Sequence, residues 1–296
     1  VAVCDQTEPP RKGVKLVPRA VSRIITPGTV TDHALLNSGE NNFLMGLIER
    51  SEALGAAFLD LSTGEFRAFQ LQEEDRWERL RLDIDHFAPK EIVFPRSREE
   101  QIPKIDDCIA TPIDDWTFDE DAATRALKDQ FGTSSLDGFG CRGQGLAIGA
   151  GGGAIYYARQ TQKTALEHIT SLRCDTQSDY MVIDSSSIRN LELLESASGG
   201  SSKDTLLGVV DRTATGMGAR LLRHWMIRPS VDAGEIVRRQ DAVEELMSST
   251  SVLDETRSSF EKMADIERLL SKVIVGSATP REIVALRTAF EKLPGL

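Results

Sequence analysis

The sequence predicts an α/β domain followed by an all-α domain, and the change of pattern near residue 175 is the first reason for this division. Between residues 31 and 174, β-prone runs alternate with helical patterns, which is typical of an α/β domain. From residue 175 to residue 296, one helical pattern follows another. A Thr-Pro-Gly sequence at 26–28, which suits a type II turn, places a further boundary near residue 30. We therefore expect a short N-terminal segment over 1–30, an α/β domain over 31–174 and helices over 175–296.

The elements of the α/β domain follow from local patterns. Strands are expected at Phe43–Ile48, Ala56–Leu61, Phe66–Leu71 and Glu91–Phe94, with a further candidate at Cys108–Pro112. The second and third pair across a Ser-Thr-Gly turn at 62–64. Helical spacing of apolar residues predicts helices at Glu73–Phe87, Phe118–Phe131 and Gly145–Gln162.

The helices of the second domain are predicted from apolar stripes and from residues that begin or end helices. The run Asp204–Pro229 predicts two helices joined by a short Thr/Gly connection. The stripe of the second contains Met217, Leu221, Leu222 and Trp225, and we expect Trp225 to anchor the core. Pro229 ends this helix because it lacks an amide donor, and Val231–Leu246 forms the next. Thr279-Pro280-Arg281-Glu282 has the residues of a capping box, so it predicts the start of a further helix.

Composition limits the class of protein. A length of 296 residues suits about two domains. No apolar run approaches the roughly 18 residues that a membrane-spanning helix needs, and the N-terminus has no signal-peptide pattern. The four cysteines, at positions 4, 108, 141 and 174, lie far apart without CxxC spacing. We expect them to be reduced thiols in the core of a cytoplasmic protein.

Charge is distributed unevenly along the chain. The net charge of −11 argues against a DNA-binding surface over the whole molecule, because duplex binding depends on Lys and Arg contacts to phosphate. The segment 1–30 is an exception, since its five basic residues outnumber two acids. The basic residues are Arg11, Lys12, Lys15, Arg19 and Arg23. Residues 99–121, by contrast, hold nine acids against one lysine.

One segment has the glycine spacing of a nucleotide-binding motif. Gly149–Ala154 reads GAGGGA, follows an apolar run and precedes a helical sequence. A dinucleotide site would use such glycines to bring backbone amides to a pyrophosphate at a helix N-terminus. The alternative is a helix rich in small residues that packs closely on a sheet. We favour this structural interpretation because the sequence after the motif ends in a weak strand at best.

Several segments in one order resemble the MutS family of DNA mismatch-repair proteins. They are Val1–Gln6, Val21–Thr29, Leu59–Phe66, Gln130–Gly140, Asn190–Gly200, Asp204–Pro229 and Asp265–Leu296. The resemblance implies the end of the mismatch-recognition domain over 1–30, a ribonuclease H-like connector domain over 31–174 and the first part of the helical lever (core) domain over 175–296. It also implies an internal fragment of a longer protein, since the chain begins at Val1 and stops within helical sequence.

The resemblance carries functional expectations for the parent protein. It would bind mismatched double-stranded DNA as a dimer, use ATP and ADP with Mg²⁺ in a C-terminal ATPase domain, and recruit MutL through the connector. No GxxxxGK phosphate loop occurs in this sequence. We therefore expect this chain to hold no catalytic, cofactor or metal residues and to act as connector and lever. Two alternatives are a MutS paralogue that acts on recombination intermediates and an enzyme domain that uses Gly149–Ala154 for a nucleotide cofactor.

Two further expectations concern single residues. Asp60 ends a predicted strand, where ribonuclease H-like nucleases carry a metal-binding carboxylate, but two-metal hydrolysis needs several acids that converge on ions about 4 Å apart. No second acid follows a convincing strand, so we expect a vacant catalytic site. The resemblance also places MutL docking on the helix before Gln130. Its candidate partner-binding residues are Arg125, Ala126, Lys128 and Asp129, and the basic residues of 1–30 are the candidates for DNA proximity.

Overall fold

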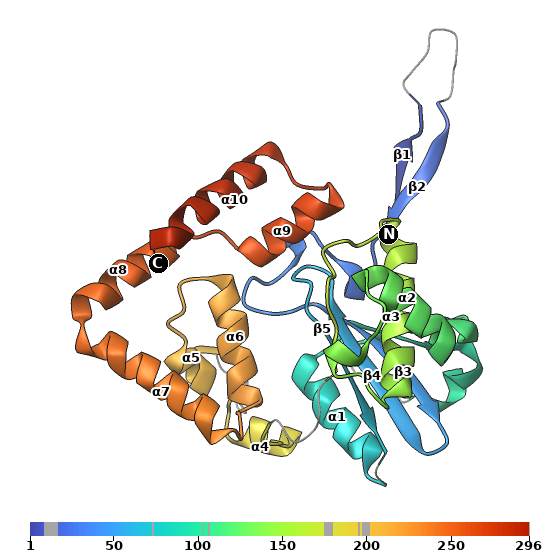
Figure 1. Cartoon of the computed structure of the whole chain (residues 1–296), viewed down its shortest axis with the longest axis horizontal. Coiled ribbons are helices and arrows are strands. Elements are labelled where there is room, and N and C mark those ends of the chain that lie inside the picture. Colours follow the sequence, from blue (N-terminus) through green and yellow to red (C-terminus); the bar gives the residue numbers. More distant parts are fainter. Residues whose placement is uncertain are drawn as a thin grey trace. The chain divides into compact units, whose positions relative to one another are not determined.

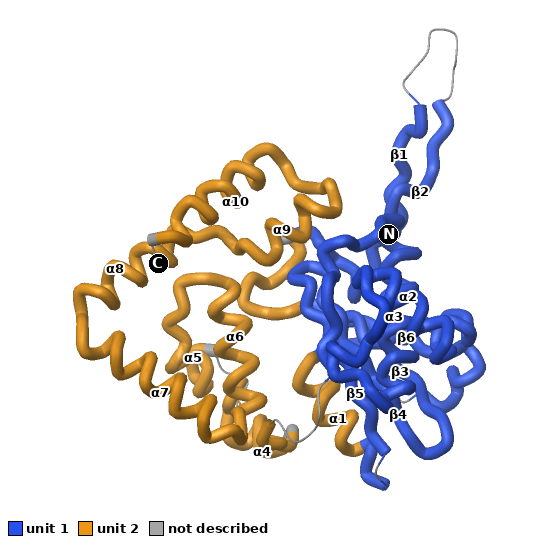
Figure 2. The backbone as a smooth tube through the Cα atoms, viewed as in Figure 1, with its two compact units in different colours: residues 1–32, 42–77, 88–174 blue, residues 33–41, 78–87, 175–296 orange. Residues whose placement is uncertain are grey.

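The computed structural model forms two compact units, each assembled from several stretches of the chain (Figure 2). The first comprises residues 1–32, 42–77 and 88–174, and the second comprises 33–41, 78–87 and 175–296. The structure describes residues 1–8, 17–72, 74–102, 104–105, 107–174, 180–194, 196 and 202–295. Two short stretches of the predicted α/β domain therefore belong, by their contacts, to the helical unit.

A mixed six-stranded sheet forms the centre of the first unit (Figure 1). Its strands are β3 (Phe43–Arg50), β4 (Ala53–Asp60), β5 (Phe66–Leu71), β6 (Glu91–Pro95), β7 (Ile109–Ile113) and β8 (Arg173–Cys174). They lie in the order β7-β6-β3-β4-β5-β8, with antiparallel β3–β4–β5 and parallel pairing at β6, β7 and β8. The predicted α/β class is confirmed.

Helix α3 (Gly145–Gln162) packs on β3, β4 and β5, and α2 (Glu120–Phe131) packs on α3. Two glycines in the sheet allow this close approach. A Cβ on Gly46 would lie 2.2 Å from the carbonyl oxygen of Ala150, and one on Gly55 would lie 2.1 Å from that of Leu146. Buried apolar side chains of the strands and of both helices, among them Leu44, Leu59, Val93, Leu127 and Ile155, form a continuous core. Helix α1 (Arg76–Phe87) lies between β5 and β6 in the chain.

Two turns differ from their prediction. Strands β3 and β4 each extend further toward the other along the chain than predicted, and only two residues separate them. These residues, Ser51 and Glu52, form the turn with left-handed φ values of 46° and 66°. Such turns favour Gly or Asn, and neither residue occurs at positions 51 and 52, so the turn could not be predicted. Pro27 and Gly28 begin a 3-10 helix, η1 (Pro27–Thr29), rather than a type II turn. Glycine is needed at 28 for space, since a Cβ there would lie 2.8 Å from the Cβ of Glu91.

An antiparallel hairpin precedes the sheet. Strand β1 (Ala2–Gln6) pairs with β2 (Arg19–Ile24), with Gln6 opposite Arg19 and Val3 opposite Arg23. The chain then enters η1, where the Thr26 side chain and Thr29 form the reciprocal contacts of a capping box. The hairpin thus leads directly into residues that contact the sheet.

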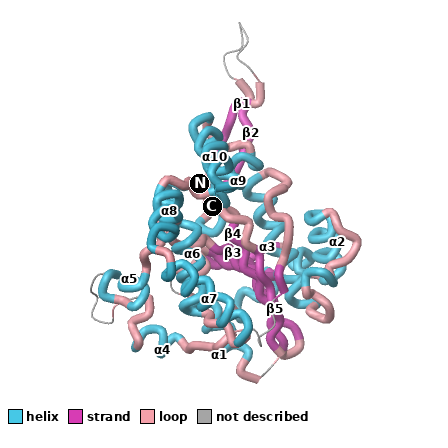
Figure 3. Tube along the Cα trace, turned by 60° about the vertical axis from the view of Figure 1, so that its left-hand side comes forward, coloured by secondary structure: helices cyan, strands magenta, loops and turns pink. Residues whose placement is uncertain are grey.

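The second unit is helical, as predicted (Figure 3). Its helices after residue 180 are α4 (Ser185–Asn190), α5 (Leu206–Val210), α6 (Gly216–Ile227), α7 (Ala233–Ser248), α8 (Thr250–Glu261), α9 (Ile266–Val275) and α10 (Pro280–Lys292). The predicted capping box at Thr279 is confirmed, because its hydroxyl accepts from the amide of Glu282 and its own amide donates to the Glu282 carboxylate.

The expected role of Trp225 is wrong. Its side chain is 37% exposed, and the guanidinium of Arg239 lies 3.8 Å from the ring centroid. On the same helix Arg220 is only 5% exposed. The apolar stripe therefore did not predict the buried face of α6. Carboxylates and a backbone carbonyl elsewhere in the unit accept hydrogen bonds from Arg220 and so allow this arginine to be buried.

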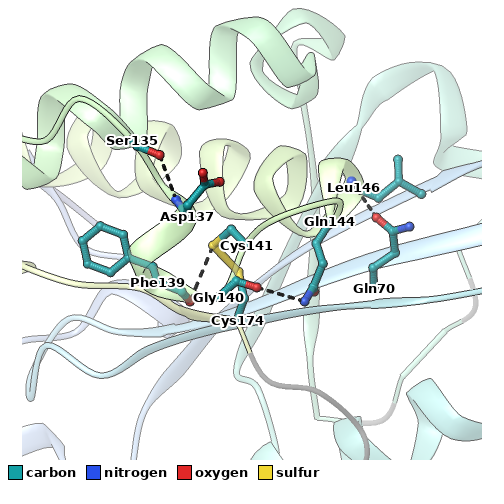
Figure 4. Close-up of a disulfide and its surroundings, with 9 residues drawn as sticks. All are labelled: Gln70, Ser135, Asp137, Phe139, Gly140, Cys141, Gln144, Leu146 and Cys174. Atoms are coloured by element: carbon teal, nitrogen blue, oxygen red, sulfur yellow. Dashed lines mark hydrogen bonds between the residues drawn. A yellow bond between two sulfur atoms is a disulfide. The ribbon is translucent and has the colours of Figure 1, made fainter.

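The prediction of four reduced core cysteines is also wrong, since two of them are paired and Cys4 is exposed. Cys141 and Cys174 form a disulfide between the loop before α3 and the end of β8 (Figure 4). Gly140, with φ of 80°, lets the loop approach, since its Cβ would lie 3.0 Å from the Cys174 carbonyl oxygen. Cys4 is exposed and Cys108 partly buried. A separation of 33 residues carries no spacing signal, so only the fold reveals the pair.

Candidate functional sites

Helix α2 carries the four predicted partner-binding residues, and its ends are well defined. The Asp119 side chain accepts from the amides of Asp121 and Ala122, and Gly132 ends the helix with φ of 61°. Near the C-terminal end, Gln130 accepts from Nε and Nη2 of Arg159 at 3.0 and 2.6 Å and donates to the carbonyls of Leu166 and Ile169. These contacts fix the rotation of α2 against α3.

The fixed rotation decides which residues of α2 face solvent. Ala123 and Leu127 are buried against α3, whereas Arg125 and Asp129 are exposed and Ala126 and Lys128 are half-buried. The predicted residues therefore share the outer side of one helix, with two charged groups free of the core.

The predicted DNA-proximal residues are only partly described. Arg11, Lys12 and Lys15 lie outside the described residues. Arg19 is exposed and Arg23 half-buried, and both lie on β2 of the N-terminal hairpin. Arg19 lies opposite Gln6 and Arg23 opposite Val3, and the register of the hairpin shifts between these two pairs, so the regular alternation of faces is interrupted between the two arginines.

The GAGGGA sequence lies within α3, as the structural interpretation predicted. The helix begins at Gly145, so the amides from Gly149 onward point along the helix rather than toward a ligand at its start. A Cβ on Gly149 would lie 2.7 Å from the Phe118 carbonyl oxygen, and one on Gly152 would lie 2.3 Å from the Cβ of Ala123. The glycines thus serve the contact between α3 and its neighbours, and the dinucleotide interpretation lacks its geometry.

Asp60 is fully buried, and its carboxylate stabilises the turn after β4. One oxygen accepts from the amide and hydroxyl of Ser62 at 2.8 and 2.7 Å, and the other accepts from the amide of Asn42 at 3.2 Å. Among the described residues, no group of three or more His, Cys, Asp and Glu side chains could hold a metal ion. Here Asp60 has the geometry of a structural carboxylate.

Glu91 is a buried polar centre that the sequence did not reveal. It is 1% exposed at the start of β6, and it accepts from the Tyr157 hydroxyl at 2.6 Å, the Thr111 hydroxyl at 2.9 Å and the Gly28 amide at 3.1 Å. Burial and the adjoining Glu91 raise the pKa of Tyr157 to about 12. The amide of Gln162 also donates to the carbonyl of Thr29 at 2.8 Å. Together these bonds attach the exit of the N-terminal hairpin to the sheet and α3.

Two buried arginines in the helical unit, Arg220 and Arg268, were also missed. Burial alone would lower the pKa of Arg220, but the hydrogen bonds that it donates to Asp265 and Glu267, together with the charges of these acids, raise it. Arginine is common on exposed helix faces, so only the position of these acids and of distant backbone carbonyls indicates burial.

None of the helices formed by the described residues combines the length and apolar character needed to cross a bilayer.

Comparison with known families assigns the chain. Three family models match consecutive segments, MutS domain I over residues 1–34, MutS domain II over 42–170 and MutS domain III over 186–296. The chain belongs to the MutS family. The sheet of the first unit is therefore MutS domain II, and the helices after residue 186 are those of MutS domain III.

The similar proteins agree with this assignment. DNA mismatch repair protein MutS of Solibacter usitatus is 40% identical over 308 aligned residues, which cover 100% of this chain and 34% of the relative. The proteins of the same name from Symbiobacterium thermophilum and Protochlamydia amoebophila are 38% and 37% identical and cover 100% and 99% of the chain. The chain spans about a third of the length of these relatives.

Proposed function

We propose that this chain is the connecting part of a DNA mismatch-repair protein, which links mismatch recognition to a helical lever. The proposal rests on the order of MutS domains I, II and III along one chain. In addition, two short segments within the α/β part of the sequence belong to the helical unit by their contacts. Because residues 33–41 and 78–87 group with the helices, the two units are joined by more than one covalent crossing. Such joining suits a part that transmits movement, and the chain would do so without chemistry of its own.

The partners of the whole protein follow from the same proposal. Mismatched double-stranded DNA would be bound by a dimer, with Arg11, Lys12, Lys15, Arg19 and Arg23 near the duplex. ATP, ADP and Mg²⁺ would be bound by a segment outside these 296 residues, which contain no GxxxxGK sequence. The site of action would be the cytoplasm. The match to MutS domain I favours mismatch repair over a paralogue that acts on recombination intermediates.

We assign MutL docking to the outer side of α2. Support comes from the exposed Arg125 and Asp129, and from Ala126 and Lys128 between them, on a helix whose rotation is fixed by Gln130 and Arg159. Small and charged residues on a rigid helix suit a protein interface, where charges govern mainly the rate of encounter.

The experiment that tests the proposal measures binding of MutL from a MutS-containing bacterium to the chain. Arg125→Glu should lower the affinity at least ten-fold and leave the melting temperature unchanged, because the side chain is exposed. Arg50→Glu is the matched control, since Arg50 is an exposed arginine of the same unit that lies on β3 instead of α2. Equal binding by both variants and by the unchanged chain would place the docking surface elsewhere.

A second measurement concerns DNA. The isolated chain should bind mismatched and matched duplexes alike, because its charge balance is unfavourable. Residual binding should fall steeply with salt, as expected for phosphate contacts, and should fall again in Arg19→Ala. A mismatch preference that persists at moderate salt would contradict the connecting role. Hydrolysis of ATP or single-stranded DNA by the pure chain would contradict the absence of chemistry.

A further inference from the structure

Two arginines of the MutS domain III match bind the segment that joins the domain I match to the domain II match. Residues 35–41 lie between the end of the domain I match at 34 and the start of the domain II match at 42. Arg268 of α9 is 2% exposed and donates from Nη1 to the carbonyl of Asn37 at 2.8 Å and from Nη2 to that of Glu40 at 2.5 Å. We call residues 35–41 the linker.

A second arginine binds the same linker from α6. Nη1 of Arg220 donates to the carbonyl of Ser38 at 2.8 Å. The same guanidinium is oriented by Asp265, whose two oxygens accept at 2.8 and 3.0 Å, and by Glu267 at 2.7 Å. Three successive bonds therefore run from buried cations to backbone carbonyls between 37 and 40, and such charge-assisted bonds are about twice as strong as neutral ones.

The linker backbone also packs closely on the first turn of α6. A Cβ on Gly216 would lie 2.7 Å from the Ser38 carbonyl oxygen, and one on Gly39 would lie 3.4 Å from the Cβ of Ala219. The Gly39 amide donates to the Asn37 side chain at 3.1 Å, which closes a turn within the linker. Hydrogen bonds and steric fit thus hold the same four residues against α6 and α9.

We propose that Arg220 and Arg268 clasp the linker to helices α6 and α9, so that a displacement of these helices passes through the linker to the first unit, to which the residues on both sides of the linker belong. A linker that merely joins two domains needs no buried cation, and flexible polar residues are sufficient for that purpose. This inference rests on the proposed connecting function, and it identifies the contacts through which the movement would pass. Arg220 and Arg268 are in this sense positioning residues.

The test measures amide hydrogen exchange and inter-unit distances in the full chain of 296 residues. Arg268→Met and Arg220→Met should speed exchange in residues 35–42 at least ten-fold while leaving α3 unchanged. Spin labels at Arg50→Cys and Ser258→Cys, with Cys4 and Cys108 replaced by Ser, should give a broader distance distribution in both variants. Arg287→Met is the matched control, because this arginine of α10 is 69% exposed in its side chain and forms an ion pair with Glu291 on the helix surface.

A second kind of variant protects the test against a general loss of folding. Gly216→Ala keeps both arginines and should displace Ser38 sterically, so it should also speed linker exchange and broaden the distances. Unchanged exchange in Gly216→Ala, or faster linker exchange without broader distances, would overturn the clasp. Loss of MutL binding leaves these readouts unaffected, so failure of the proposed function and failure of the clasp are distinguishable.

Discussion

Tyr157 of α3 donates a hydrogen bond from its hydroxyl to Oε1 of Glu91 on β6, 2.6 Å away. Oε2 of the same carboxylate accepts from the Gly28 amide. One buried side chain therefore connects a helix, the sheet and the turn through which the N-terminal hairpin leaves. A buried carboxylate is stable only when its oxygens are hydrogen-bonded, so each of these donors contributes to the position of the hairpin exit.

Tyr157→Phe should lower the free energy of unfolding by about 1.5–3 kcal/mol, since it removes a bond to a charged group. The loss should shrink at high pH. The folded pKa of Tyr157, about 12, lies above its ordinary value of 10.0, so the stability is fully present below pH 10 and lost as the pH rises through 12. Denaturant unfolding at pH 8 and pH 11 checks this. Tyr156→Phe, which keeps the edge contact with Trp116, should change little, and equal effects of both variants would contradict the role of Glu91.

Gly152→Leu should destabilise the first unit by about 1–3 kcal/mol or more, because an added side chain overpacks the contact between α3 and α2. A Cβ alone would already lie 2.3 Å from that of Ala123. Gly138→Ala is the control, since nothing lies within 4 Å of its Cβ position. Thermal unfolding with NAD(H) or FAD added gives a second readout. Protection by either cofactor would restore the dinucleotide interpretation of Gly149–Ala154.

The fold was largely predictable because its signals are local. The strand Phe66–Leu71, the helix Gly145–Gln162 and the capping box at Thr279 each depend on residues a few positions apart, and all three were found within a residue of their predicted bounds. The start of α2 was less clear, because Asp119 caps a helix that the pattern began at Phe118, whereas its end at Phe131 agrees with the prediction. Local patterns thus carried most of the secondary structure.

The polar centres could not be predicted, because their partners lie far apart in sequence. Arg268 and Asn37 are separated by 231 residues, and Glu91 and Tyr157 by 66. Whether a charged residue is buried depends on such partners, and a single sequence does not show them. The predicted residues of α2 faced outward as expected of a polar helix surface, while their docking role stays a prediction.

Replacing both Cys141 and Cys174 by Ala should lower the free energy of unfolding by about 3–4 kcal/mol, because the bond closes a loop of 33 residues in the unfolded chain. Thiol titration of the denatured chain without reductant provides a direct check. Two reactive thiols, those of Cys4 and Cys108, are expected. Four would show that the pair is reduced, and the double substitution should then cost far less. Cys4→Ser serves as the control, since that side chain is exposed.

Glu282→Gln tests a charge at the start of α10. Its carboxylate accepts from Lys272 and from the Thr279 amide, and these bonds lower its pKa to about 2. Glutamine keeps the capping bond but loses the charge, so the variant should be less stable at pH 7 by up to about 1 kcal/mol, as expected for a partly exposed pair. Because the folded pKa lies below the ordinary value of 4.5, this stability is present above pH 4.5 and lost as the pH falls through 2. Melting temperatures of variant and unchanged chain should therefore converge as the pH falls from 4.5 to about 2. Glu291→Gln, in an exposed pair with Arg287 on the same helix, should show almost no difference at any pH, and a constant difference for Glu282→Gln would mean that its charge is not what stabilises the helix start.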